Sequence, residues 1–213
     1  DGVLSNTLLF NMTGGKLTVS GSMTSQDMIQ LAGTVGGTGS ITVNGAYSWS
    51  SGPWLDVGSF QFLGSLTLLS ANAKNIVSRQ VVSDCDVNWL AGNIGMSEGA
   101  RWTHKPTRTL TASHGSVRYD FAGDASSRFV LEGTFDKLSG LESVHSVIIE
   151  AAPASSFQVG SASLPGCKLN LTGSGSSFAG QITTSPDSMI RFVSGAFDLT
   201  ATADVQGSGS IQI

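Results

Sequence analysis

The stretch GGTGSITVNG at residues 36–45 places Gly37 and Gly39, with one residue between them, before a short run of alternating apolar and polar residues. The same pattern returns as GSGSIQI at residues 207–213. A dinucleotide-binding loop would need a third glycine where Thr42 stands, and it would open a helix rather than a strand. We therefore interpret the stretch as a tight corner that leads into a strand, since glycine tolerates the positive φ angles of sharp turns.

Short strands with alternating apolar residues recur at steady spacing. Ten of them begin at Leu17, Ile41, Leu66, Val87, Thr109, Arg128, Val147, Leu169, Ile190 and Ile211. The starts of successive strands lie 19 to 25 residues apart. Repeats of about this length are typical of solenoids. Weaker strands lie between them, for example at 48–52 and 60–64. The sequence thus predicts an all-β, right-handed parallel β-helix with rungs of about 19–25 residues, forming a single domain over residues 1–213.

A β-sandwich is the alternative fold, because it too contains many short alternating strands separated by turns. Similar sequence at whole-repeat distances favours the solenoid: YSWSSG (47–52) and VNWLAGN (87–93) both place a tryptophan three residues before a glycine. Cys85 and Cys167 discriminate between the folds. In a solenoid about four rungs would separate them by about 19 Å, beyond the roughly 7 Å limit for a disulfide. We expect no disulfide between them, and no metal site, since no histidine stands at ligand spacing.

Composition narrows the classes of partner. Only 12% of the residues are charged, and 15 acidic against 11 basic residues leave no basic stripe for nucleic acid. No apolar run has the length of a membrane span. Two N-glycosylation acceptors, Asn11 and Asn170, lie in alternating runs that would direct them to solvent. Together with the hydroxyl-rich composition, they predict an extracellular or cell-surface location.

The densest charge cluster, EGARWTHKPTR at residues 98–108, and two aspartates near it suggest an enzyme alternative. Asp84 and Asp86 would share one side of a strand, and Arg101 and Arg108 follow one repeat later. Carbohydrate-active β-helices build their sites from such residues on an exposed face. The Asp-Asp, Gly-His-Gly and Arg-Ile-Lys signatures of polygalacturonases are missing, so we expect no enzymatic activity and no cofactor. Trp89 is expected in the core, and it would offer a glycan-binding platform if exposed.

LEGTFDKL (131–138), LNLTGSGSSFAGQI (169–182) and RFVSGAFDLT (191–200) make the chain resemble the glycine-rich right-handed β-helix repeats of large secreted, adhesin-like surface proteins. The resemblance covers the chain from about Leu31 onward. It implies an extracellular structural or adhesive segment of a longer protein, without catalytic residues, that acts as a rigid stalk or a surface-filament subunit.

The final strand runs to Ile213 without a polar cap, so we expect its edge to meet further chain or a partner. The expected partners are other copies, neighbouring chains of a surface assembly, or glycans. The alternatives are a polysaccharide lyase or hydrolase on the same scaffold, and a phage-type fibre segment. Convergence of the acidic and basic cluster in one groove would indicate the enzyme, and trimerisation would indicate the fibre.

Overall fold

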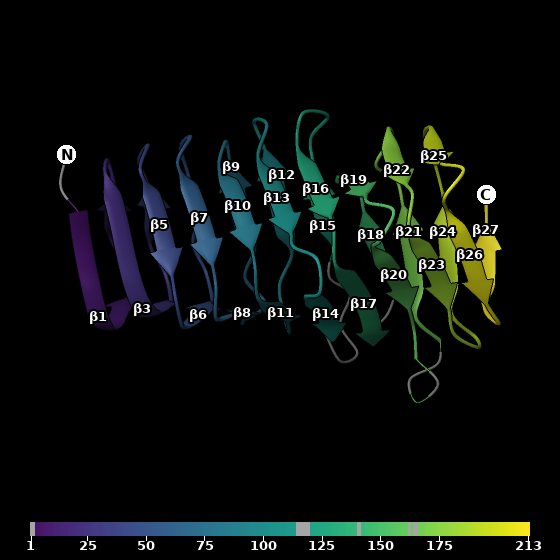
Figure 1. The fold of residues 1–213 in the computed structure, drawn as a ribbon, viewed down its shortest axis with the longest axis horizontal. Coiled ribbons are helices and arrows are strands. Elements are labelled where there is room, and N and C mark those ends of the chain that lie inside the picture. The colour runs from purple at the N-terminus through teal and green to yellow at the C-terminus, as the bar shows by residue number, and fades with distance from the viewer. Residues whose placement is uncertain (1–2, 114–119, 140–141, 162, 164–165) are drawn as a thin grey trace.

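The computed structural model describes residues 3–113, 120–139, 142–161, 163 and 166–213, and within these ranges the chain forms strands and turns without a helix. Figure 1 shows the strands side by side in chain order, from the N-terminus at one end to the C-terminus at the other. Every described strand pairing is parallel and joins a strand to one in the next rung. The predicted parallel β-helix is confirmed, and the β-sandwich is not observed.

Each complete rung contributes one strand to each of three ladders. Ladder 1 contains β5 (Ser40–Val43), β7 (Ser59–Phe62), β10 (Gln80–Ser83), β13 (Arg101–His104), β16 (Arg128–Leu131), β19 (Ile148–Ala151), β22 (Ser176–Phe178) and β25 (Phe197–Leu199). Ladder 2 contains β6 (Ala46–Trp49), β8 (Ser65–Leu68), β11 (Asp86–Trp89), β14 (Thr109–Ser113), β17 (Thr134–Ser139), β20 (Ser156–Val159), β23 (Gln181–Thr184) and β26 (Asp204–Gly207). Ladder 3 contains β2 (Lys16–Thr18), β4 (Thr34–Gly36), β9 (Lys74–Val77), β12 (Ile94–Ser97), β15 (Phe121–Gly123), β18 (Ser143–His145), β21 (Lys168–Leu171), β24 (Met189–Phe192) and β27 (Ser210–Gln212).

The first rungs are simpler than the later ones. β1 (Val3–Met12) and β3 (Ser22–Gln30) are long strands that run across ladders 1 and 2. Trp54 continues ladder 3 between β4 and β9 through isolated parallel bridges. An early rung advances from Ser22 to its register partner Ser40, whereas a later and longer one advances from Arg101 to Arg128. The rungs thus lengthen toward the middle of the chain and slightly exceed the predicted range in both directions.

The ten strands used to predict the repeat are all strands, but they are not counterparts of one another. The strand at Ile41 lies in ladder 1, the strand at Leu66 in ladder 2 and the strand at Leu169 in ladder 3. All three ladders have the same alternation of buried and outward residues. The predicted period is therefore correct. The ten strands belong to different ladders, however, so they do not occupy equivalent positions in successive rungs.

The glycine-rich stretch forms a corner, as predicted. Gly37 has a φ of +97°, and a Cβ at this position would lie 2.2 Å from the carbonyl oxygen of Val19 in the rung before. Gly207 has a φ of +117°, and its Cβ would lie 2.0 Å from the Thr184 carbonyl oxygen. The first corner joins ladders 3 and 1, and the second joins ladders 2 and 3. The motif therefore specifies a corner shape against the preceding rung, not one position in the repeat.

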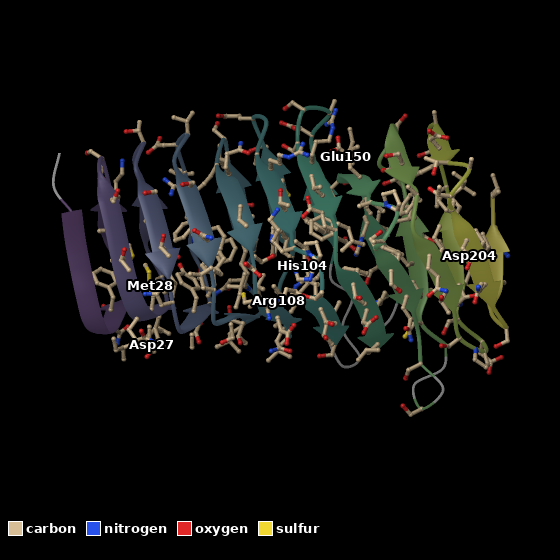
Figure 2. The ribbon with its side chains drawn as sticks, in the orientation of Figure 1. Asp27, Met28, His104, Arg108, Glu150 and Asp204 are labelled. Carbon is tan, nitrogen blue, oxygen red and sulfur yellow. The ribbon has the colours of Figure 1, made fainter. Side chains whose placement is uncertain are left out.

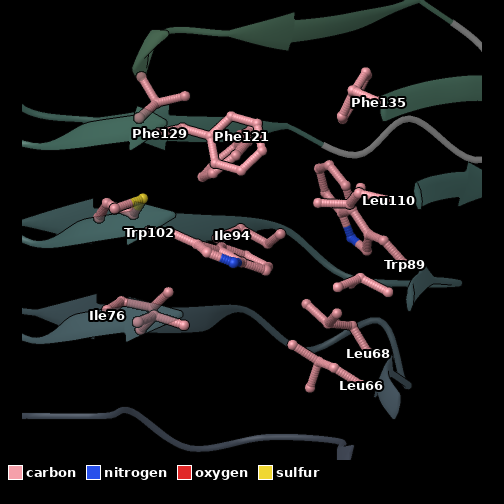
Figure 3. Packing of buried hydrophobic residues seen from close by; sticks show 14 of the residues in the cluster. Leu66, Leu68, Ile76, Trp89, Ile94, Trp102, Leu110, Phe121, Phe129 and Phe135 are labelled. Atoms are coloured by element: carbon pink, nitrogen blue, oxygen red, sulfur yellow. The ribbon is translucent and has the colours of Figure 1, made fainter. Parts of the chain in front are cut away.

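The inward residues form one continuous apolar column (Figure 3). All four tryptophans are fully buried. Trp49 and Trp89 occupy the same column two rungs apart, with Leu68 between them. Each indole Nε1 donates to the carbonyl oxygen of the glycine three residues later, at 2.9 Å for Trp49 and 2.7 Å for Trp89. This hydrogen bond gives the shared tryptophan–glycine spacing a structural reason, since it satisfies a buried donor at a corner.

Candidate functional site

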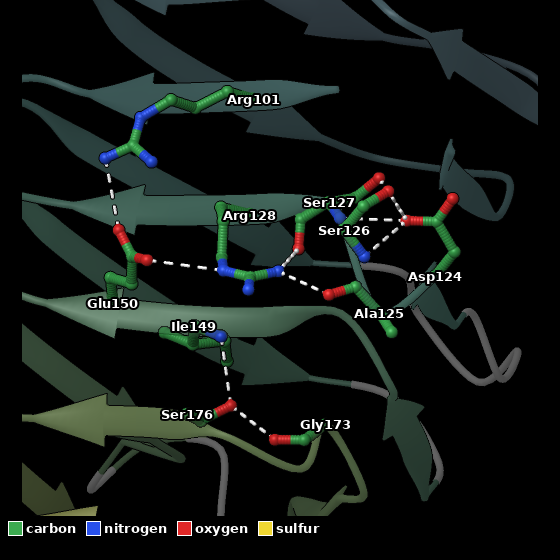
Figure 4. A network of polar contacts seen from close by, with 10 residues as sticks. All are labelled: Arg101, Asp124, Ala125, Ser126, Ser127, Arg128, Ile149, Glu150, Gly173 and Ser176. Atoms are coloured by element: carbon green, nitrogen blue, oxygen red, sulfur yellow. Dashed lines mark hydrogen bonds and ion pairs between the residues drawn. The ribbon is translucent and has the colours of Figure 1, made fainter. Parts of the chain in front are cut away.

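A network of charged side chains lies on the outer face of ladder 1. Arg101 and Arg128 are register partners in β13 and β16, and Glu150 of β19 lies beyond them. One carboxylate oxygen of Glu150 lies 3.1 Å from the Arg101 Nη2 and the other lies 3.3 Å from the Arg128 Nε (Figure 4). We call these three residues the ion-pair belt. A single carboxylate thus forms ion pairs with both of the like charges that the stacked strands bring together.

A second charged group lies where β10 passes into β11. The Arg108 Nε lies 3.1 Å from the Asp84 Oδ1, and the Asp86 Oδ1 accepts a hydrogen bond of 3.0 Å from the backbone N–H of Thr109. Three of the residues predicted as one cluster, namely both aspartates and Arg108, therefore meet at a corner. Both carboxylates are engaged with the next rung of the solenoid.

Arg101 does not join this corner. Its guanidinium contacts Glu150, and Figure 2 shows Glu150 and Arg108 on separate parts of the surface. The four residues that would have to converge in the enzyme alternative are thus divided between two groups. Lys105 adds another bridge to the next rung, at 3.1 Å from Glu132. All of these groups link one rung of the solenoid to another.

Asp124 organises the turn between β15 and β16. Its Oδ1 accepts hydrogen bonds from the backbone N–H groups of Ser126 and Ser127, at 3.0 and 2.8 Å, and from both hydroxyls (Figure 4). These bonds, above all the one from the Ser127 hydroxyl, hold the pKa of Asp124 well below its usual range. Its other oxygen accepts from the N–H of Glu98 at 2.7 Å. The carboxylate therefore closes a turn and caps the previous rung.

Several buried polar side chains were not predicted. Lys74 and Arg79 are fully buried, and both turn inward at corners to donate to backbone carbonyls. Burial lowers the pKa of Lys74 to about 8. His104 is also buried, with its Nδ1 at 2.9 Å from the Ser83 hydroxyl oxygen, and burial lowers its pKa. A sequence signal existed, since Lys74 and His104 occupy inward positions of alternating strands.

The aromatic and cysteine expectations resolve clearly. Trp89 is fully buried and its ring lies 6.0 Å from that of Phe121, so the core interpretation is correct and the assignment as a glycan-facing residue is wrong.

Cys85 and Cys167 are both buried and no disulfide joins them. Burial, reinforced by the Asp86 carboxylate, raises the pKa of Cys85 to about 12, so its thiol is protonated at neutral pH.

The two glycosylation acceptors lie in different environments. Asn11 is exposed on β1. Asn170 is half-buried on β21, and its Nδ2, the atom that would carry a glycan, donates a hydrogen bond to Glu142. Of these two acceptors, Asn11 is thus the one whose amide is open to solvent in the folded chain.

Metal ligation and membrane insertion are the remaining classes of site. Within the described ranges, no cluster of three or more histidine, cysteine, aspartate or glutamate residues has the geometry of a metal site. In that same part of the chain, no helix has the length and apolarity needed to cross a membrane.

Comparisons with protein-family profiles, with curated proteins and with solved structures gave no significant match. The fold and its side-chain geometry are therefore the grounds on which a function can be proposed. They define the chain as a parallel β-solenoid whose charged side chains mainly join one rung to the next.

Proposed function

We propose that this chain is a non-catalytic, rigid spacer of an extracellular surface structure, which holds binding partners at a fixed distance and presents its lateral faces to them. The observation that carries the proposal is the continuity of three parallel ladders around one apolar column over the described rungs. A stacked sheet of this kind stays rigid because each rung is bonded to the next along all three faces.

The outer surface supports the same role. The outward column of ladder 2 from Ser48 to Gln206 contains serine, threonine, asparagine, glutamine and a single aspartate, and no cation. Such a face is solvated through hydroxyl and amide groups. The exposed acceptor Asn11 and the low charged fraction are the features that support an extracellular location.

Mechanical unfolding tests the spacer proposal. Release of one rung, such as that from Gln80 to its register partner Arg101, would add about 65 Å of contour length at roughly 3.4 Å per extended residue. Pulling the chain by its ends in an atomic force microscope should therefore give discrete steps of about this size or multiples of it. Smooth extension at low force, as for a flexible linker, would contradict the proposal.

The enzyme alternative requires its own assay. Purified protein incubated with acidic and neutral polysaccharides should release neither unsaturated products nor new reducing ends. Turnover that disappears in Asp84→Asn, while the mechanical steps persist, would show that the spacer carries a catalytic site.

A filament subunit is the second candidate, and an exposed apolar surface at β25, β26 and Ile213 favours it. Leu199, Val205 and Ile213 are exposed there by 40%, 46% and 97%, beside a hollow lined by Phe192 and Phe197. A neighbouring copy stacked on this surface would bury it. In sedimentation velocity, the sedimentation coefficient should then increase with protein concentration. This increase should be smaller for Leu199→Ser. A defined trimer would instead favour the fibre alternative.

A further inference from the structure

The outer face of ladder 3 is hollowed where it passes over β9, β12 and β15. β12 presents Gly95 outward, next to Asn75 of β9 and Ala122 of β15. Because Gly95 and Ala122 add almost no volume, the larger side chains around them enclose a shallow groove of about 430 Å³. A second hollow of about 690 Å³ adjoins it at the corner toward ladder 1 and shares Leu55 and Val77 with it.

The floor of this continuous groove is apolar. Leu55 and Val77 line both hollows, and Pro53 and Ala122 line the first. Val57 also lines the second hollow and is 67% exposed. Adjoining apolar side chains in a hollow offer a surface on which the methylene stem of a long side chain can pack.

The rim of the groove is acidic. Asp56 and Glu98 line the second hollow and Asp124 lines the first, whereas the described residues that line the two hollows include no lysine, arginine or histidine. The Asp56 Oδ2 accepts a bond of 2.6 Å from the N–H of Gly37. Burial lowers the pKa of Arg79, and the nearby Asp56 carboxylate partly offsets this lowering.

Glu98 and Asp124 are held by neutral donors. The Glu98 Oε2 accepts from the Ser78 hydroxyl at 2.9 Å, and Asp124 accepts from serines and from the Glu98 N–H. Within the described ranges neither carboxylate forms an ion pair. By contrast, Glu150 on ladder 1 and Glu132, which directly follows β16, form ion pairs with arginine or lysine. Among the described residues, Glu98 and Asp124 therefore carry negative charge that no ion pair neutralises.

We propose that this groove binds a basic peptide segment of a partner protein, with lysine or arginine stems on Leu55 and Val77 and their charged heads at Glu98 and Asp124. A long basic side chain matches both features, since its methylene stem packs on apolar surface and its head pairs with a carboxylate. A glycan fits less well, because the residues that line the two hollows include no aromatic ring on which a sugar could stack. The binding role goes beyond the spacer function and does not depend on its stiffness.

Fluorescence anisotropy with a labelled octapeptide of alternating lysine and valine tests the proposal, using the full chain. The lysine–valine peptide should bind in low salt and weaken as salt is added, and a peptide with glutamate in place of lysine should not bind. Glu98→Gln should weaken binding by about threefold to fivefold, as expected for one rim charge. The matched control, Glu132→Gln, removes the same charge from ladder 1 and should leave binding unchanged.

Val57→Ser tests the apolar floor, because Val57 is exposed and its replacement leaves the core intact. This variant should also weaken the lysine–valine peptide, and it should not affect a lysine–serine peptide. Absence of binding by the lysine–valine peptide, equal binding of the glutamate peptide, or equal loss in Glu98→Gln and Glu132→Gln would each overturn the proposal. Competition by a neutral oligosaccharide at the same site would overturn it in favour of a glycan.

Discussion

The corner at Gly37 gives the most specific prediction about stability. Gly37 and Gly99 both have positive φ angles, +97° and +72°. They differ in their surroundings, because a Cβ on Gly37 would lie within 3 Å of three backbone atoms of Val19, whereas a Cβ on Gly99 would meet no atom within 4 Å. Alanine at the two sites therefore separates backbone strain from a clash between rungs.

The two costs can be estimated separately. An L-residue in the left-handed region costs about 1–2 kcal/mol, which is all that Gly99→Ala should lose. Gly37→Ala has the same strain and must also displace the backbone of the preceding rung, which adds about 1–3 kcal/mol by analogy with overpacked cores. We expect Gly37→Ala to destabilise the chain by about 2–5 kcal/mol, and by at least about 1 kcal/mol more than Gly99→Ala.

Urea unfolding followed by tryptophan fluorescence measures this difference. Trp49 and Trp54 lie in the rung that Gly37 opens and are stacked at 3.6 Å, so their emission reports on the affected region. The lowered urea midpoint of Gly37→Ala should be accompanied by an early loss of this buried-indole signal. Equal midpoints for the two alanine variants would refute the close contact between rungs.

Three further predictions concern buried and surface polar groups. Gln30→Leu should lower the free energy of unfolding by about 2–4 kcal/mol, because the Gln30 Oε1 accepts hydrogen bonds from two buried donors. Tyr47→Phe removes only one of these donors and should cost clearly less. Equal losses of the two variants in urea unfolding would contradict this prediction. Glu150→Gln should lower the free energy of unfolding by about 0.5–1 kcal/mol at low salt, more than Glu132→Gln, because Glu150 pairs with two arginines and Glu132 with one lysine. The difference between the two variants should vanish in about 1 M salt, where screening is nearly complete. A difference that does not change with salt would contradict this prediction. Burial lowers the folded-state pKa of His104, so the unfolded chain binds more protons than the folded chain just below pH 6.5. The free energy of unfolding should therefore fall as the pH drops through this range, and His104→Gln should lessen that fall. Parallel pH profiles for the two proteins would contradict this prediction.

The fold was predictable because its signals are local. Alternation of buried and outward residues, with glycine at corners, is visible in the short segments ITVNG and LNLTG themselves. The assignment of strands to ladders was not predictable. A strand such as β8 alternates in the same way as β5 or β21, and nothing in so short a segment says which face of the coil it forms.

The candidate site was harder to predict because its contacts cross rungs of unequal length. Asp84 and Arg108 are separated by close to one period, so their pairing follows from the repeat. Arg101 and Glu150 are two rungs apart, and the long rung between Arg101 and Arg128 shifts the register in between. A rung of the length found between Gln80 and Arg101 would align Arg101 with Ala122 and miss both Arg128 and Glu150.

The stacking of rungs is the central claim, and distances along one outward column test it most directly. Ser48, Thr67, Asn88, Thr111, Asp136, Gln158, Thr183 and Gln206 form consecutive register partners in ladder 2. Spin labels on Ser48 and on Gln158, Thr183 or Gln206, with both native cysteines replaced by alanine, would span five, six and seven rungs. Pulsed electron paramagnetic resonance should give narrow distributions of the distance between the labels, centred at about 24, 29 and 34 Å, with an increase of roughly 4.8 Å per rung. Distances that do not increase in this order, or broad overlapping distributions, would contradict the solenoid.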